Sequence, residues 1–287
     1  FRLAETAGAI VAFFYLSWGI NYARADLVRR THWESYAEKA LGKPDAERLA
    51  KLCDELVEAS NAEYVRALGV EDLGRPSSPV FAVSHTDAAI ESAYVRVTER
   101  LKLHPTFAVS RGKAKPVLIS PVMSRLLISG FYSPWTGEAN YNTEVPACKL
   151  SEVIAHEKAH QRGITSEDEA NFFGFLACIS SEDPYVRYSG YLMAQRQLLP
   201  ELGNLDGMRA KAIIAKRFKG VQRDADAIRA FIASHRGRVS AVGSAVNNAY
   251  LKANRVSAGV KSYQLSAQLI LVFVESNGGT CVLGSGR

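Results

Sequence analysis

The chain carries two histidines four residues apart, and a glutamate directly follows the first of them. They lie in the run IAHEKAH, residues 154–160. On a helix, residues i and i+4 project from the same face, so both imidazoles can reach one zinc ion at about 2.0–2.1 Å. Zinc lowers the pKa of a bound water toward 7, and a carboxylate next to the first histidine can take that proton. The spacing predicts two zinc ligands, His156 and His160, and a general base, Glu157.

The alternative interpretation of this run is a surface helix with two unrelated histidines. The neighbours Val153, Ile154, Ala155 and Ala159 are apolar or small, which is typical of a buried helix. A buried helix with two histidines and a glutamate needs partners for these polar groups, and a metal ion provides them. The context therefore favours a metal site.

A zinc site of this kind needs a third protein ligand. Gly163 follows His160 by three residues and is expected to end the helix. The metzincin pattern would place a further histidine three residues after that glycine, but the residue there is Ser166. The alternative is an acidic ligand from a second helix, and the run SEDEAN at residues 166–171 supplies three acids.

Helix capping separates these three acids. Ser166 and Glu169 have the spacing of a capping box, in which Glu169 reaches back to the N-cap N–H group. Asp168 could act likewise if the cap is Thr165. Glu167 is then the acid left free for the metal, with Glu169 as its rival. The remaining alternative is that all three acids only complement the helix dipole.

The elements that must position this site are mainly helical. Apolar spacing predicts helices over Glu34–Leu41, Ala46–Leu68, Thr86–Leu103 and from Leu150 onward, with a helix start at Asp183 and a break at Gly203. Short β-prone runs occupy residues 106–109, 117–119 and 126–132, and a turn-rich segment covers 134–142. We expect an α+β fold, mainly α-helical, with a small sheet just before the motif helix.

The start of the chain is apolar and uncharged from Gly8 to Ile20. This run is short for a membrane span, which needs about 20 residues. Trp18 and Tyr22 resemble an interfacial aromatic belt, and arginines follow at 24, 29 and 30. We expect residues 1–23 to be a truncated transmembrane or membrane-proximal helix, with a buried core helix as the alternative. Residues 24–287 then form the catalytic domain, and the arginines favour the cytoplasmic side for it.

Nearly half the residues are apolar, so the chain can form a sizeable core. The net charge is only +6 and indicates no particular class of partner. Lysines and arginines are spread along the chain and no stacking motif occurs, so we do not expect nucleic-acid binding. The four cysteines form no CxxC pair. Cys53 and Cys178 lie in apolar, helix-like contexts and are expected to be buried thiols.

Two adjoining runs, HEKAHQRG (156–163) and SEDEANF (166–172), resemble the bacterial family catalogued as domain of unknown function 3810. The same likeness extends to WGINYAR (18–24), SGFYSPWTGEANYN (129–142), DPYVRYSGY (183–191), YLKAN (250–254) and GVKSY (259–263). It covers nearly the whole chain. The resemblance implies a protein anchored in the bacterial cell membrane and similar to zinc metallopeptidases, but it supplies no substrate.

The run EDEAN (167–171) is also similar to the ExxAD element of the CAAX-prenyl-protease-like and HtpX-like gluzincins. There the first Glu is the third zinc ligand, which again points to Glu167, and the Asp corresponds to Asn171. This likeness implies that Asn171 accepts a hydrogen bond from a ligand imidazole without adding charge. The gap between HExxH and the third ligand is far shorter here, which departs from the pattern of those enzymes.

Zincin-like folds place an edge strand just before the motif helix, where it pairs with extended substrate. Residues 137–142 stand at that place, with a structural loop as the alternative. The candidate edge residues are Gly137, Glu138, Ala139 and Asn140. A downstream Tyr, His or Arg would stabilise the oxyanion. The candidates are Tyr188, Tyr250 and Tyr263, for each of which packing is the alternative.

Together these observations predict a zincin-like metallopeptidase core that binds one Zn²⁺ through His156, His160 and Glu167. Glu157 would activate water for attack on a peptide carbonyl. The expected partners are a peptide or protein substrate and, through the N-terminal segment, membrane lipid. The competing hypothesis is a non-catalytic zinc-binding scaffold or sensor at the membrane. Glu157 argues against it, because a structural zinc site needs no base.

Overall fold

The computed structural model describes residues 2–42, 45–237, 241 and 262–283. Its helices are α1 (Arg2–Ser17), α2 (Leu27–Arg30), α3 (Glu34–Ala40), α4 (Ala46–Leu68), α5 (Val83–Arg100), α6 (Ser120–Arg125), α7 (Ala147–Gln161), α8 (Glu167–Ile179), α9 (Pro184–Leu205), α10 (Gly207–Ile214), α11 (Lys219–His235) and α13 (Ser262–Ser276), with 3-10 turns at Gly19–Ala23 and Pro105–Phe107. The strands are β1 (Lys115–Pro116), β2 (Gly130–Ser133) and β3 (Glu138–Tyr141). The fold is α+β and mainly helical, as the sequence predicts.

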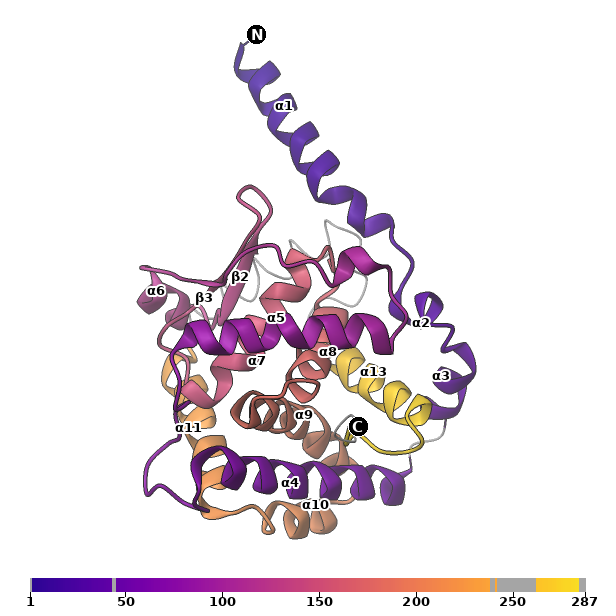
Figure 1. The fold of residues 1–287 in the computed structure, drawn as a ribbon, viewed down its shortest axis with the longest axis vertical. Helices are drawn as coiled ribbons and strands as arrows, with labels where there is room; N and C mark the ends of the chain where they lie inside the picture. Colours follow the sequence, from indigo (N-terminus) through magenta and orange to yellow (C-terminus); the bar gives the residue numbers. More distant parts are fainter. Residues whose placement is uncertain (1, 43–44, 238–240, 242–261, 284–287) are drawn as a thin grey trace.

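Helix α8 forms the centre of the core, between α7, α9 and α13 (Figure 1). Every residue of α8 from Glu169 onward is buried. The ring of Phe172 makes edge contacts with Trp33 and Phe273, so the start and the end of the described chain both pack on this helix. A helix that is apolar on all sides is stable only in such surroundings.

Glycines allow the three central helices to approach closely. A Cβ atom on Gly174 of α8 would lie 3.2 Å from the backbone nitrogen of His156, and one on Gly190 of α9 would lie 2.6 Å from the Cβ atom of Cys178. Larger side chains at these positions would push the helices apart. The close packing holds the motif helix α7 directly against the helix that begins with the acidic run.

The small sheet has the strand order β1-β3-β2. β3 pairs in antiparallel fashion with β2 along its whole length and in parallel with β1 at Asn140 and Tyr141. The stretch predicted as an edge strand, Gly137–Asn140, therefore contributes to the central strand, and that prediction is wrong. β1 and β2 are the edges. The turn-rich composition of this stretch does not indicate a central strand. Asn140 and Tyr141 are nevertheless buried and paired on both sides, and these tertiary contacts outweigh local strand propensity.

Other local predictions are partly correct. α4 has the predicted bounds, with Asp45 capping its start and Gly69 in the left-handed region after its end. Residues 106–109 form no strand, because Phe107 turns inward to pack on Tyr94 and Phe173. The break predicted at residue 203 occurs at residue 206, between α9 and α10. All four cysteines are buried and free.

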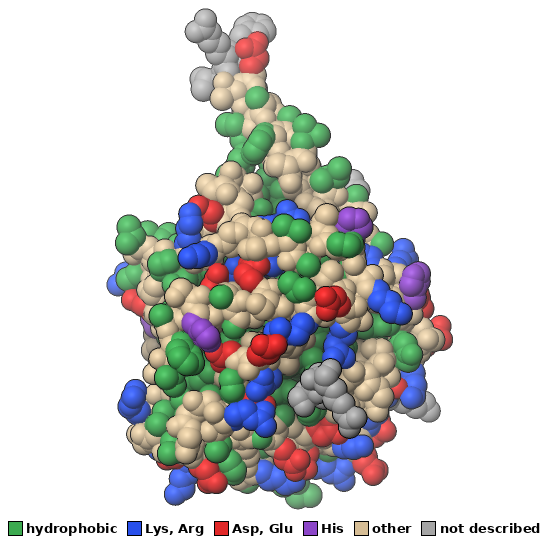
Figure 2. All heavy atoms as spheres, viewed as in Figure 1, with side chains coloured by type: hydrophobic (Ala, Val, Ile, Leu, Met, Phe, Trp, Pro, Cys, Tyr) green, Lys and Arg blue, Asp and Glu red, His purple; other side chains and the backbone are tan. Residues whose placement is uncertain are grey.

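Helix α1 projects from the body, and hydrophobic side chains cover much of its surface (Figures 1 and 2). Ile10, Val11, Phe13 and Leu16 are all exposed, so the alternative of a buried core helix is wrong. No helix in the described part of the chain is both long and apolar enough to cross a membrane. The end of α1 contacts the β2–β3 hairpin, where Trp18 is buried 4.6 Å from the ring of Tyr132.

The substitution Gly174→Val tests the close packing of α7 and α8. The added side chain meets the backbone of His156, so we expect the free energy of unfolding to fall by about 1–3 kcal/mol. Gly203→Val in α9 is the control, because a Cβ atom there has no neighbour within 4 Å. Urea denaturation of both variants measures the difference, and equal stability would show that the contact at Gly174 does not limit the packing.

Candidate metal centre

Two histidines of α7 and one glutamate of α8 bring three ligand atoms together. The Nε2 atoms of His156 and His160 lie 3.1 Å apart. The Oε2 of Glu167 lies 3.3 Å from the Nε2 of His156, and its Oε1 lies 3.5 Å from the Nε2 of His160. Ligand atoms around a tetrahedral ion with bonds of about 2.0–2.1 Å are about 3.3–3.4 Å apart. The polar atoms of the three side chains therefore lie about as far apart as the ligand atoms of a tetrahedral site.

A hydrogen bond at one ring nitrogen of His160 directs the other ring nitrogen toward the cluster. The Nδ1 of His160 lies 2.7 Å from the carbonyl oxygen of Ile164, which can only accept, so Nδ1 carries a proton and Nε2 is the nitrogen directed at His156 and Glu167. Ile164 occupies this place because Gly163, at φ +84°, ends α7 as predicted. The N–H group of Ile164 then donates back to Ala159 at 3.2 Å.

Electrostatics at the site favour a cation. Burial lowers the pKa of His160, but the carboxylates of Glu167 and Glu157 and the hydrogen bond to Ile164 together raise it more, to about 9. Burial works to raise the pKa of Glu167, yet the two histidines outweigh it and hold this pKa well below its ordinary range. An ionised, buried carboxylate beside two imidazoles attracts a positive charge, whether a proton or a metal ion.

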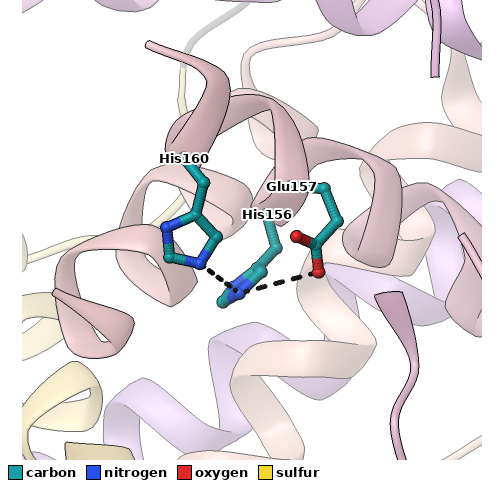
Figure 3. A group of neighbouring side chains, drawn as sticks. All are labelled: His156, Glu157 and His160. Carbon is teal, nitrogen blue, oxygen red and sulfur yellow. Dashed lines mark hydrogen bonds and ion pairs between the residues drawn. The ribbon is translucent and has the colours of Figure 1, made fainter. Parts of the chain in front are cut away.

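Glu157 stands next to the ligand group, and Figure 3 shows its carboxylate pointing to the same region as the two imidazoles. Its Oε1 lies 4.0 Å from the Nε2 of His156 and within 4.8 Å of the ligand nitrogen of His160. Distance alone would admit Glu157 as a ligand, but Glu167 is closer to both nitrogens. Burial raises the pKa of Glu157 against the opposing effect of the histidines, which makes its carboxylate a stronger base.

A glycine in β2 makes room for this glutamate. A Cβ atom on Gly130 would lie 2.7 Å from the Oε1 of Glu157 and 2.8 Å from the backbone oxygen of Asn140. No side chain fits between the strand and the carboxylate. Gly130 therefore positions Glu157, a role that the sequence analysis missed, since a single glycine in a β-prone run gives no distinct signal.

The two other acids of the run have different partners. Glu169 accepts a hydrogen bond from the backbone N–H of Leu27 at 2.6 Å and forms an ion pair with Arg30. Asp168 accepts from the hydroxyl of Ser166. The capping-box prediction is wrong, because Ser166 makes no side-chain cap and Glu169 is held by α2. Of the three acids, Glu167 is the one directed at the histidines.

The opposite face of α7 carries buried charges that the sequence analysis also missed. Lys158 has no exposed surface and lies 3.0 Å from Asp87 and 2.5 Å from Glu91, both on α5. Arg162 contacts Glu91 at 2.6 Å and covers the ring of Tyr94. These contacts fix the rotation of α7, so the two histidines face α8. Lysine in an apolar helix is a usable signal, because it requires a buried acidic partner.

The end of α7 also holds the neighbouring segments. The Nε2 group of Gln161 donates to the backbone oxygens of Arg111 and Gly137, at 2.8 and 2.9 Å. Arg24 donates to the backbone oxygen of Gly163 at 3.3 Å. The hairpin and the segment after α1 are thereby attached within a few residues of His156, His160 and Glu167.

The structure describes the side chains of two of the four remaining predicted residues, Tyr188 and Asn171. Tyr188 donates to the buried carboxylate of Asp224 at 2.7 Å and packs on Tyr64, so its hydroxyl is not available for an oxyanion. Tyr250 and the side chain of Tyr263 lie outside the described residues. Asn171 is buried and its Nδ2 has no partner. Among the described residues, no histidine donates a hydrogen bond to Asn171.

The third ligand can be identified by comparing Glu167→Gln with Glu169→Gln. We expect Glu167→Gln to lose zinc affinity by more than the roughly 10–100-fold that removal of a supporting group costs. Glu169→Gln should keep zinc and lose thermal stability, because it removes the charge paired with Arg30. Chelator competition measures affinity, and zinc loss in Glu169→Gln alone would contradict this assignment.

Comparison with known proteins places the chain in a family. The family model described as protein of unknown function, DUF3810, matches residues 2–271. No curated protein and no solved structure matches the chain. The family match spans the projecting helix, the sheet and the whole histidine–glutamate cluster, in agreement with the resemblance seen in residues 156–163 and 166–172. The chain is a member of the DUF3810 family of proteins of unknown function.

Proposed function

We propose that this protein is a zinc-dependent metallopeptidase with a zincin-like core. The observation that carries the proposal is the set of short distances among three side chains. The two Nε2 atoms of His156 and His160 lie 3.1 Å apart, and they lie 3.3 and 3.5 Å from the Oε2 and Oε1 of Glu167, respectively. Two imidazoles and one carboxylate are the ligand set of several catalytic zinc sites, which leave the fourth position for water or substrate. A buried carboxylate, Glu157, lies beside that set.

Each side chain has a distinct part in the proposed hydrolysis. A bound zinc ion supplies Lewis acidity. Glu157 accepts a proton from the attacking water and then donates it to the leaving amine, and its raised pKa suits both steps. The bond from His160 to the carbonyl of Ile164 keeps the imidazole in the tautomer that binds metal. The charge of Glu167 offsets part of the charge of the ion.

Strand β2 is the sheet edge next to the proposed base. One side of β2 pairs with β3, and Gly130 at its start lies against Glu157. An extended peptide that adds to the outer side of β2 would place its backbone close to Glu157. This strand therefore takes the substrate-binding role that was expected of residues 137–140.

Attachment to the bacterial cell membrane through residues 1–23 is part of the same proposal. It is supported by the exposed apolar side chains of α1 and by the arginines at 24, 29 and 30. These arginines would place the catalytic domain on the cytoplasmic side. The competing scaffold or sensor function would keep the metal site and the membrane attachment without hydrolysis.

The variant Glu157→Gln separates catalysis from metal binding. The amide cannot take a proton, so we expect cleavage of casein or a peptide library to fall about 10²–10⁴-fold while zinc content stays near one ion per chain. Metal analysis and cleavage are measured on the same preparation. Wild-type protein that binds no zinc would refute the proposal, and zinc-loaded protein that cleaves no substrate would favour the scaffold or sensor.

The variant Gly130→Ala tests how β2 positions the base. The added methyl group overlaps Oε1 of Glu157, so we expect kcat to fall about 10-fold or more with zinc content unchanged. Ser133→Ala, at the other end of the same strand, is the matched control. Wild-type activity in Gly130→Ala would show that Glu157 acts from another position.

A further inference from the structure

The segment between α5 and β3 presents apolar side chains to solvent. Leu118 is 101 % exposed, Ile119 58 %, Val122 52 % and Trp135 52 %. Scattered apolar residues are ordinary on a protein surface, but a group of them on adjoining elements marks an interaction site. The first three lie at α6 and Trp135 lies in the β2–β3 hairpin.

α6 and the hairpin are joined to each other. The hydroxyl of Ser120 accepts from the backbone N–H of Thr143, and Asn142 donates to the hydroxyl of Ser124 at 3.0 Å. Both serines belong to α6, and Asn142 directly follows β3. The apolar group is therefore carried by one connected part of the molecule.

The same segment carries a net positive charge, because it lacks acidic residues. Residues 101–137 contain no Asp or Glu, and Arg111, Lys113, Lys115 and Arg125 are all exposed. Lys115 forms an ion pair with Glu138. Exposed apolar and aromatic side chains among basic ones suit the interface of a bilayer that contains anionic lipid. A protein partner with an uncharged surface would gain no binding energy from these basic side chains.

The position of α1 relates this segment to the membrane. The ring of Phe13 stacks on that of Trp135 at 5.8 Å, and Phe14 lies 5.9 Å from it. Figure 1 shows the hairpin pointing out of the body on the side from which α1 projects. Figure 2 shows hydrophobic side chains along α1 and also over the region of α6, with basic side chains close by.

We propose that Leu118, Ile119, Val122 and Trp135, with Arg111, Lys113 and Arg125, form a lipid face that rests on the surface of an anionic membrane. This contact is additional to α1, and two weak contacts together give stable attachment where one does not. If the proposed peptidase function holds, β2 lies close to the bilayer, and its substrate is a polypeptide that emerges from the same membrane.

An environment-sensitive fluorophore on the full chain tests the lipid face directly. Ile119→Cys and Val122→Cys can be labelled selectively, because the four native cysteines are buried. Met208→Cys on α10 is the matched control, since Met208 is as exposed but lies at the opposite end of the body from α1. Each labelled protein is mixed with vesicles of phosphatidylcholine containing phosphatidylglycerol, and with vesicles of phosphatidylcholine alone.

We expect emission at positions 119 and 122 to rise about twofold or more with the anionic vesicles, to rise less with the neutral ones, and to stay unchanged at 208. Reversal of charge by Arg111→Glu, Lys113→Glu and Arg125→Glu together should abolish the preference for anionic vesicles. No rise at 119 and 122 while the protein floats with the vesicles overturns the proposal. So does a rise without vesicles that grows with protein concentration, which identifies a second copy of the chain.

The outcome is independent of the peptidase proposal. Zinc content and cleavage of a soluble peptide are measured on the same labelled proteins, and neither should change. A fluorescence rise in a protein that binds no zinc and cleaves nothing would leave the lipid face in place and refute the peptidase alone. Cleavage by a zinc-loaded protein that shows no fluorescence rise would support the peptidase and refute the lipid face.

Discussion

The close contact between α7 and α8 is the constraint on which the rest of the structure depends. At Gly174 the two helices are so close that an added Cβ atom would lie 3.2 Å from the backbone nitrogen of His156. Only at this distance can Glu167, at the start of α8, reach the imidazoles that project from α7. The tight turn at Gly163 between the helices serves the same purpose, because it also places the carbonyl of Ile164 on His160.

A helix that carries so many buried polar groups needs a definite orientation. α7 directs its two histidines to α8, while Lys158 meets Asp87 and Glu91 on the opposite face. Nearer its start, Glu152 forms a bidentate pair with Arg196 of α9. Buried ion pairs add little net stability, but any rotation of the helix would leave several charges without partners. Their effect here is to fix the rotation of α7 and with it the direction of the two histidines.

The segments around the site are tied to the same helix, which links the projecting α1 to the metal centre. The hairpin is fixed by Gln161, and the chain after α1 is fixed by the bond from Arg24 to the carbonyl of Gly163. Trp18 packs on Tyr132 of β2, the strand whose Gly130 makes room for Glu157. A continuous series of contacts therefore joins the end of α1 to the sheet and to Glu157.

The sequence by itself determined the elements whose signals are local. The spacing of His156 and His160, the helix end at Gly163 and the capped helix α4 all depend on residues within one or two turns of each other, as does the mainly helical class of the fold. Only the tertiary structure decided which acid faces the histidines, because Glu169 is held by Leu27, 142 residues away in the chain. It likewise made residues 138–141 a central strand, and it engaged Tyr188 with Asp224. Such contacts leave no periodic trace in the sequence, since each depends on a partner that only the folded chain brings near.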